Sequence, residues 1–333
     1  MHSEIESRVE RAIEEKVFPG CVIGIVRSNG TREVMPFGHF TYESDSPRVA
    51  ENTVYDVASI TKSIPTASLA LSLIAEGRLG LADKVSEHLP KLRSDHGATI
   101  EDLLQYRVQG PTLSTLKDKA AEEILEYIFA HGFDAPPSGE ARYTNLPAFL
   151  LGLIVERVGV GTLDKMAQEH FFEPLGMKDT TFFPDVRLRK SNIVPTEIVD
   201  GKEIRGIVHD ESARVFARAG RAVGHAGLFS TVPDILNFLE ALLQRKYPDV
   251  VDGAQKGFGW QTEGAFLGKY AGPAVGGAGK HAFGKTGFTG ASCVCDIERG
   301  VVFVILSNRT YPKRSPNGDA INAFRADIAD IMY

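Results

Sequence analysis

Apolar residues recur at helical spacing near both ends of the chain. Near the N-terminus, four of them share one helical face: Ile5, Val9, Ile13 and Val17. Near the C-terminus a second face carries Ile321, Phe324, Ile328 and Ile331. Each pattern predicts an amphipathic helix with one face to bury, and Ser3 with Glu6 predicts a capping box at the start of the first.

Strand-like runs follow the first helix and precede the last. Residues 21–27 and 31–37 flank Asn29-Gly30, a pair that favours a two-residue hairpin turn. Three more runs lie at 282–288, 291–297 and 301–307, after a glycine-rich stretch at 272–279 that we expect to form a loop.

Helical patterns fill the middle of the chain. They cover 59–76, 118–131, 146–158, 163–172 and 232–243, the last with Thr231 and Asp234 as a plausible cap. Strands at both ends with helices between them predict an α+β fold. We expect one antiparallel sheet, built from both termini and flanked by the terminal helices, with an inserted helical lobe. The expected boundaries are 1–58 plus 256–333 for the sheet lobe and 59–255 for the helical lobe, with the active site in the cleft between them.

Composition narrows the classes of partner. The 333 residues are 43% hydrophobic and 24% charged, and 37 basic against 43 acidic side chains give a net charge of −6. This mild acidity argues against nucleic acid as a partner, and the longest apolar runs are too short to span a bilayer. No secretory signal opens the sequence, so we expect a cytoplasmic protein unless an export signal was removed.

Cysteines and histidines suggest no metal centre or cofactor. Cys21, Cys293 and Cys295 are too few for a disulfide framework and are interpreted as buried apolar residues. His209, with Asp210 and Glu211 after it, and His225 match no zinc spacing. They are interpreted as structural histidines, with His225 in a loop near the cleft.

Ser59-Ile60-Thr61-Lys62 opens the first central helical pattern. Residues three apart share a helical face, so the hydroxyl of Ser59 and the amine of Lys62 can meet. A serine needs a base to become a nucleophile, and a lysine whose pKa is lowered by burial can be that base. Taken alone, the same spacing also fits a solvated helix.

Two further motifs contain polar residues suited to the same chemistry. Tyr143-Thr144-Asn145 follows an expected loop, and a tyrosine near a cation can act as acid or base. Lys285-Thr286-Gly287 lies on an expected strand, where the lysine supplies charge, the threonine a donor and the glycine close backbone approach. The amides of Ser59 and Phe288 could then form an oxyanion hole.

Residues 279–286 also match the phosphate-loop pattern G-x-x-x-x-G-K-T. A phosphate loop leaves a strand and enters a helix, whereas this stretch follows a glycine-rich segment and precedes strand-like runs. We interpret the match as chance and keep nucleotide binding as a minor alternative.

Taken in order, the three motifs resemble those of the serine β-lactamase and penicillin-binding superfamily. Tyr143-x-Asn145 is similar to the motif of its class C β-lactamase, D-Ala-D-Ala carboxypeptidase and family VIII esterase branch. Flanking stretches resemble that branch over nearly the whole chain, at residues 18–20, 76–79, 174–177 and 227–231. The resemblance implies a β-lactamase/transpeptidase-like fold.

The resemblance also implies a role for each motif residue. Ser59 attacks a carbonyl and forms an acyl-enzyme, while Lys62 and Tyr143 share acid and base duty. Asn145 orients the substrate amide or the lysine, Lys285 with Thr286 receives a substrate carboxylate, and the amides of Ser59 and Phe288 hold the oxyanion. Residues 105–110 depart from the Thr-His-Thr-Ser-Gly-like segment of many relatives, and Pro65 predicts a distortion behind the serine motif.

The leading hypothesis is therefore a metal-free serine hydrolase that acts on a small-molecule or peptide-like substrate. The substrate is an ester, a D-amino-acid peptide-like amide or a β-lactam, with esterase or peptidase activity favoured over antibiotic resistance. The alternative from another class is a catalytically inactive relative that binds a peptide or cell-wall fragment.

Overall fold

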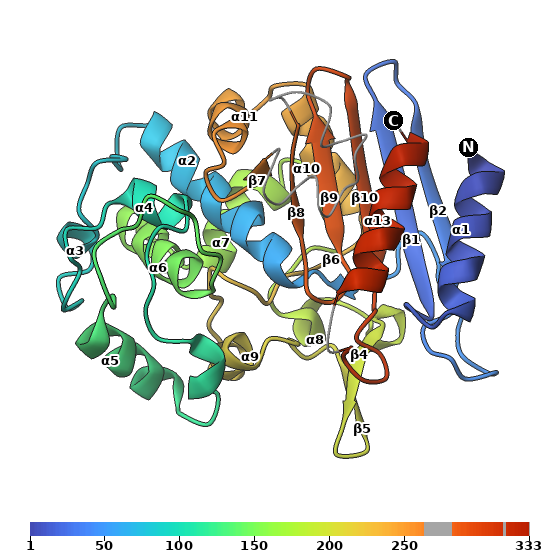
Figure 1. Cartoon of the computed structure of the whole chain (residues 1–333), viewed down its shortest axis with the longest axis horizontal. Helices are drawn as coiled ribbons and strands as arrows, with labels where there is room; N and C mark the ends of the chain where they lie inside the picture. The colour runs from blue at the N-terminus through green and yellow to red at the C-terminus, as the bar shows by residue number, and fades with distance from the viewer. Residues whose placement is uncertain (263–281, 316–317, 333) are drawn as a thin grey trace.

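The computed structural model describes residues 1–262, 282–315 and 318–332. Its main sheet has six antiparallel strands in the order β2-β1-β10-β9-β8-β7 (Figure 1). The strands are β1 Gly20–Arg27, β2 Arg32–Gly38, β7 Gln261–Thr262, β8 Ala282–Thr286, β9 Ser292–Asp296 and β10 Val301–Ser307. All six come from the two ends of the chain, which confirms the predicted sheet and fold class.

Side chains along each strand point alternately to the two faces of the sheet, and both faces are buried. In β1, Ile23 and Ile25 contribute to one apolar cluster, and Val22 and Val26 to the other. The first face is covered by α1 (His2–Glu14) and α13 (Asp319–Met332), which pack against each other. The second is covered by α10 (Val232–Leu243), which lies behind the sheet in Figure 1. This is the period-2 pattern of a sheet buried on both sides.

α10 lies within the segment expected to form the helical lobe, yet it packs on the sheet. A Cβ atom on Gly24 of β1 would clash with Val232 of α10, so the glycine permits the close approach. Thr231 accepts a hydrogen bond from the amide of Asp234, as the cap prediction requires. The boundaries of the two lobes stay a prediction. α10 contacts both the sheet and other helices.

The remaining helices form the second half of the molecule. They are α2 Ser68–Ala75, α3 Val85–His88, α4 Ile100–Leu104, α5 Ala121–His131, α6 Leu146–Gly159, α7 Leu163–Ala167, α8 Pro184–Arg187, α9 Glu211–Arg218 and α11 Pro248–Gln255. Short helical turns cover Ala58–Lys62, Ser63–Ala67, Leu113–Leu116, Gln168–Phe172 and Lys190–Asn192. Two small antiparallel pairs join β3 Tyr55–Asp56 to β6 Phe229–Ser230 and β4 Pro195–Val199 to β5 Lys202–Arg205.

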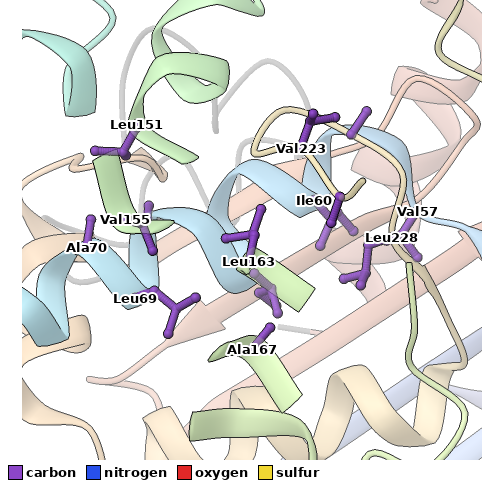
Figure 2. Close-up of a cluster of buried hydrophobic side chains, with 14 of the residues drawn as sticks. Val57, Ile60, Leu69, Ala70, Leu151, Val155, Leu163, Ala167, Val223 and Leu228 are labelled. Carbon is purple, nitrogen blue, oxygen red and sulfur yellow. The ribbon is translucent and has the colours of Figure 1, made fainter. Parts of the chain in front are cut away.

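An apolar cluster joins the helices around the serine motif (Figure 2). Ile60 lies close to Val223 and Leu228, while Leu69 and Ala70 of α2 lie near side chains of α6 and α7. All of these side chains are almost fully buried. The turn that carries Ser59 is therefore held by a packed core rather than by a solvated helix.

Two local predictions meet different outcomes. The single helix expected over 59–76 is instead a 3₁₀ turn, a π-helical turn and then α2, with Ile64 at φ −113° and ψ 106°. This break lies directly before Pro65, where distortion was predicted. The capping box at Ser3 is wrong, because the N-cap of α1 is Met1, two residues earlier, and no side chain caps the helix.

The three cysteines are free and buried, as predicted. By length and composition, the helical stretch Ala58–Ala75 could cross a membrane, as could the bent pair Leu146–Gly159 and Leu163–Phe172 taken as one span. However, 78% of Ala58–Ala75 is buried inside the protein. That burial is typical of a core helix.

Candidate active site

Ser59 is positioned by the short strand before it. The buried carboxylate of Asp56, at the end of β3, accepts hydrogen bonds from the amides of Ala58 (2.8 Å) and His209 (2.7 Å). Ala58 adopts a left-handed φ of 46° and so turns the chain into the 3₁₀ turn. Burial raises the pKa of Asp56 to about 6, although these two amide donors oppose the rise. The serine thus sits at a tightly held bend.

Lys62 meets Ser59 one turn later, as the spacing predicted. Its Nζ atom lies 2.8 Å from Oγ of Ser59 and donates a hydrogen bond of 2.7 Å to the carbonyl oxygen of His225. The side chain is almost completely buried, and this burial lowers the pKa of Lys62 to about 7, against an opposing effect of Asp210. Near neutral pH the amine therefore has a large neutral fraction that can accept a proton.

Tyr143 lies between two buried lysines. Nζ of Lys62 is 5.3 Å from the centre of its ring, and Nζ of Lys285 is 4.9 Å from it. The ring of Tyr106 packs against Tyr143 with centroids 5.1 Å apart. A phenol flanked by two amines is in the setting expected of an acid or base.

Lys285 and Thr286 line different cavities, although they are adjacent on β8. Thr286 lines the cavity that contains Ser59. Lys285 instead lines a neighbouring cavity of about 290 Å³, where Nζ bonds to the hydroxyl of Tyr106 and the carbonyl of Gly259, both at 3.1 Å. Burial lowers the pKa of Lys285 well below its ordinary value, and the nearby Lys62 adds to this effect. A joint role of the two residues on one carboxylate stays a prediction.

The end of β8 passes close to the residues before Ser59. A Cβ atom on Gly287 would clash with the carbonyl oxygen of Val57, so glycine is required here. The ring of Phe288 is 47% exposed and stacks on His209 (5.8 Å) and on the guanidinium of Arg309 (4.6 Å). The structure therefore brings residues 288 and 59 to the same cavity, while their service as an oxyanion hole stays a prediction.

That cavity measures about 500 Å³ and gathers most of the predicted site residues. They are Ser59, Tyr143, Asn145, Thr286, Gly287 and Phe288. Other polar side chains of its lining are His209, Asp210, Glu211, Arg309, Arg314, Asp319, Asn322 and Arg325. Lys62 lies behind the serine, and Lys285 lies across Tyr143.

The sequence analysis considered Asp210 only as part of a zinc set and did not predict its place in the serine site. Its carboxylate accepts hydrogen bonds from Asn145 Nδ2 (3.1 Å), Ser212 Oγ (2.7 Å) and the amide of Ala213 (2.9 Å), and lies 3.3 Å from His225 Nε2. Burial opposes ionisation, but His225 and these hydrogen bonds outweigh it and hold the pKa of Asp210 well below its usual range. The available signal was an aspartate just before a helix, the pattern of an N-cap.

The two histidines differ in their surroundings. His225 is fully buried beside Asp210, and its backbone carbonyl is the acceptor for Lys62. His209 lies 3.3 Å from Glu197 and under the ring of Phe288. Among the described residues, one group of three could share a metal ion, Asp83, Glu87 and His88, and none of these lines the cavity.

The phosphate-loop match lies partly outside the described residues, at 279–281. Its described part, Ala282–Thr286, is strand β8, and a turn then leads into β9 rather than into a helix. A phosphate site needs the amides of a helix N-terminus after the loop. This arrangement argues against nucleotide binding here.

Comparison with known proteins identifies the family and the fold of the chain. A family model described as Beta-lactamase matches residues 5–328. A putative D-alanyl-D-alanine carboxypeptidase of Escherichia coli (strain K12) is 28% identical, over 81% of this chain and 73% of its own length.

Two solved structures share the fold. EstCE1, a hydrolase with promiscuous acyltransferase activity, has a TM-score of 0.76 at 20% identity and covers 100% of this chain and 98% of its own. A class C beta-lactamase in complex with cefoxitin has a TM-score of 0.78 at 16% identity and covers 99% and 98%.

Proposed function

Because the chain belongs to the beta-lactamase family, we propose that it is a serine hydrolase that forms an acyl-enzyme on Ser59. The observation that carries the proposal is the 2.8 Å contact between Lys62 Nζ and Ser59 Oγ at the edge of a polar cavity. A neutral amine has two N–H groups and one lone pair. With one N–H donated to the carbonyl of His225, the lone pair is free to take the proton of Ser59.

The first half-reaction then has a simple balance. The Oγ–H proton moves to Lys62 as Oγ bonds to the substrate carbonyl carbon, and the negative oxygen faces the amides of residues 59 and 288. The bond to the leaving group breaks when that group takes a proton, with Tyr143 beside Lys62 as the relay. A water molecule then attacks the acyl carbon, passes its proton back through the same groups and releases Ser59.

We favour a carboxylic ester as the substrate class. The amine expected to receive a substrate carboxylate, Lys285, is already bonded to Tyr106 and Gly259 in a separate cavity. A substrate without a carboxylate does not need that amine. A D-amino-acid peptide-like amide is the second candidate, supported by the name of the E. coli relative, and both rank ahead of a β-lactam.

A labelling experiment tests the acyl-enzyme. A fluorophosphonate should add one covalent mass to the protein, seen by intact-mass spectrometry, and Ser59→Ala should abolish the adduct. Ser114→Ala, at an exposed serine, is the matched control and should label like the wild type. Labelling that persists in Ser59→Ala would overturn the proposal.

A substrate panel then ranks the classes. Short-chain p-nitrophenyl esters, a peptide ending in D-Ala-D-Ala and a chromogenic cephalosporin should be compared by kcat/KM. We expect the ester to lead. Covalent labelling with turnover of none of the three would instead favour a ligand-binding relative that keeps a reactive serine.

A further inference from the structure

The carboxylate of Asp210 contacts two separate parts of the candidate site. On one side it accepts a hydrogen bond from Asn145, two residues after Tyr143. On the other it lies beside the imidazole of His225, whose backbone carbonyl binds Lys62. Its side chain is 22% exposed and lines the cavity that contains Ser59.

We propose that Asp210 is a positioning residue for acylation. It holds the segment Tyr143–Asn145 and the His225 carbonyl that binds Lys62 in fixed positions relative to each other. It also supplies a negative charge close to Lys62. The inference rests on the proposed reaction at Ser59. Within the described part of the chain, no hydrogen bond joins Asp210 to Lys62 directly, so Asp210 acts through other residues.

The hydrogen bonds fix how His225 is held. Ser212 Oγ donates to Asp210 at 2.7 Å, so its oxygen is free to accept from Nε2 of His225 at 3.0 Å. Nδ1 of His225 is buried and has no hydrogen-bond partner within the described chain. This network assigns the proton to Nε2, where it faces both Asp210 and Ser212. Burial lowers the pKa of His225 although Asp210 opposes the change, so the ring is neutral near pH 7.

The backbone of His225 transmits this placement to Lys62. The imidazole Nε2 that faces Asp210 and the carbonyl oxygen that binds Lys62 belong to the same residue. This residue is completely buried and packs edge-on against Phe149, with ring centroids 5.7 Å apart. If the imidazole loses its anionic partner, the carbonyl that orients the Lys62 amine loses its anchor. Displacements of this kind cost rate even when no reacting group changes.

The charge of Asp210 also sets the proton affinity of Lys62. Lys62 contacts Ser59, the backbone carbonyl of His225 and the ring of Tyr143 from the loop before α6, and Lys285 from β8 is close enough for the two positive charges to repel. Asp210 is the group that raises the pKa of Lys62 against the effect of burial. Removing its charge should therefore lower the pKa of Lys62.

The test compares Asp210→Asn with the neighbouring Glu211→Gln. Both remove one negative charge from the cavity wall, but Glu211 pairs with Arg314 and not with the Asn145 and His225 network. The readout is the second-order rate constant of fluorophosphonate labelling between pH 5 and 9. For Asp210→Asn we expect the plateau to fall by about 10²-fold and the acidic midpoint to move down by roughly half a unit to one unit. The Glu211→Gln midpoint should stay at the wild-type value.

The outcomes separate this inference from the proposed function. A wild-type protein that does not label refutes acylation at Ser59. A wild type that labels, with a folded Asp210→Asn whose midpoint is unchanged, refutes the positioning role, because a purely structural defect lowers the plateau without moving the midpoint. If Asp210→Asn does not fold, Asp210→Ser carries the same test. It also removes the charge, so a downward shift of the midpoint supports the role, and an unchanged midpoint overturns it.

Discussion

The carbonyl oxygen of His225 accepts a hydrogen bond of 2.7 Å from Nζ of Lys62, a residue 163 positions earlier in the chain. The contact removes one of the amine's rotational choices and leaves its lone pair toward Ser59. Because the amine is also buried, water does not compensate for its charge, and the neutral form is favoured. One backbone atom thereby helps to convert an ordinary lysine into a base.

The first prediction concerns the pH dependence of acylation. Lys62 acts only when neutral, so the labelling rate should rise with pH through a midpoint of about 7, the lowered pKa of Lys62, and then level off. Replacing Lys62 by Met should lower the plateau by about 10³-fold, within the range for loss of an acid–base group. Rate constants measured from pH 5 to 9 check this. A wild-type rate independent of pH over that range would contradict Lys62 as the base.

The second prediction concerns stability. In the unfolded chain Lys62 keeps its proton up to an ordinary pKa near 10.5, whereas in the folded chain it loses it near 7. Between these values the unfolded state binds more protons, so the free energy of unfolding should rise with pH, by up to about 1.4 kcal/mol per pH unit from this one group. Below pH 7 Lys62 carries its proton in both states, so this group no longer makes the free energy of unfolding depend on pH.

Lys62→Met should flatten that rise between pH 7.5 and 8.5, as measured by urea unfolding at each pH. Lys117→Met, at an exposed lysine, is the control and should keep the wild-type slope. Equal slopes in Lys62→Met and the wild type would show that Lys62 is not held neutral in the folded state.

A third prediction follows from the close approach of Gly287 to Val57. A methyl group at residue 287 would collide with a backbone carbonyl that cannot rotate away, so Gly287→Ala should push β8 from the turn that carries Ser59. We expect labelling to slow by about 10²-fold or more while the protein remains folded. Gly139→Ala is the matched control, because an added Cβ there meets nothing within 4 Å. Normal labelling by Gly287→Ala would show that this contact does not position the site.

The fourth prediction concerns Tyr106, which lines the same cavity as Lys285. Its hydroxyl is one of two oxygen partners of the buried Lys285 amine. Tyr106→Phe should lower the free energy of unfolding by about 1–3 kcal/mol, because a buried polar group loses a partner. Tyr127→Phe, at a 44% exposed tyrosine, should have no measurable effect. Equal stability of the two variants would mean that Lys285 finds another partner.

Local patterns in the sequence were enough for most of the fold. β10 and α10 begin and end at the predicted residues, and the first hairpin and the last helix lie where period and turn residues placed them. These features depend on spacing and turn chemistry within a few residues, which a sequence displays directly. The error at Ser3 is of the same local kind, since helix ends are decided by small energies.

Spacing also determined that Ser59 and Lys62 could meet, because residues three positions apart in a helical turn lie on the same face. It could not determine that Lys62 is buried, that His225 supplies its acceptor or that Asp210 joins Asn145 to His225. Nor could it show that Lys285 and Thr286 line different cavities. These features depend on contacts between distant segments and on exclusion of water. The sequence therefore named the reacting groups, whereas the packing of the tertiary structure set their proton affinities and their orientation.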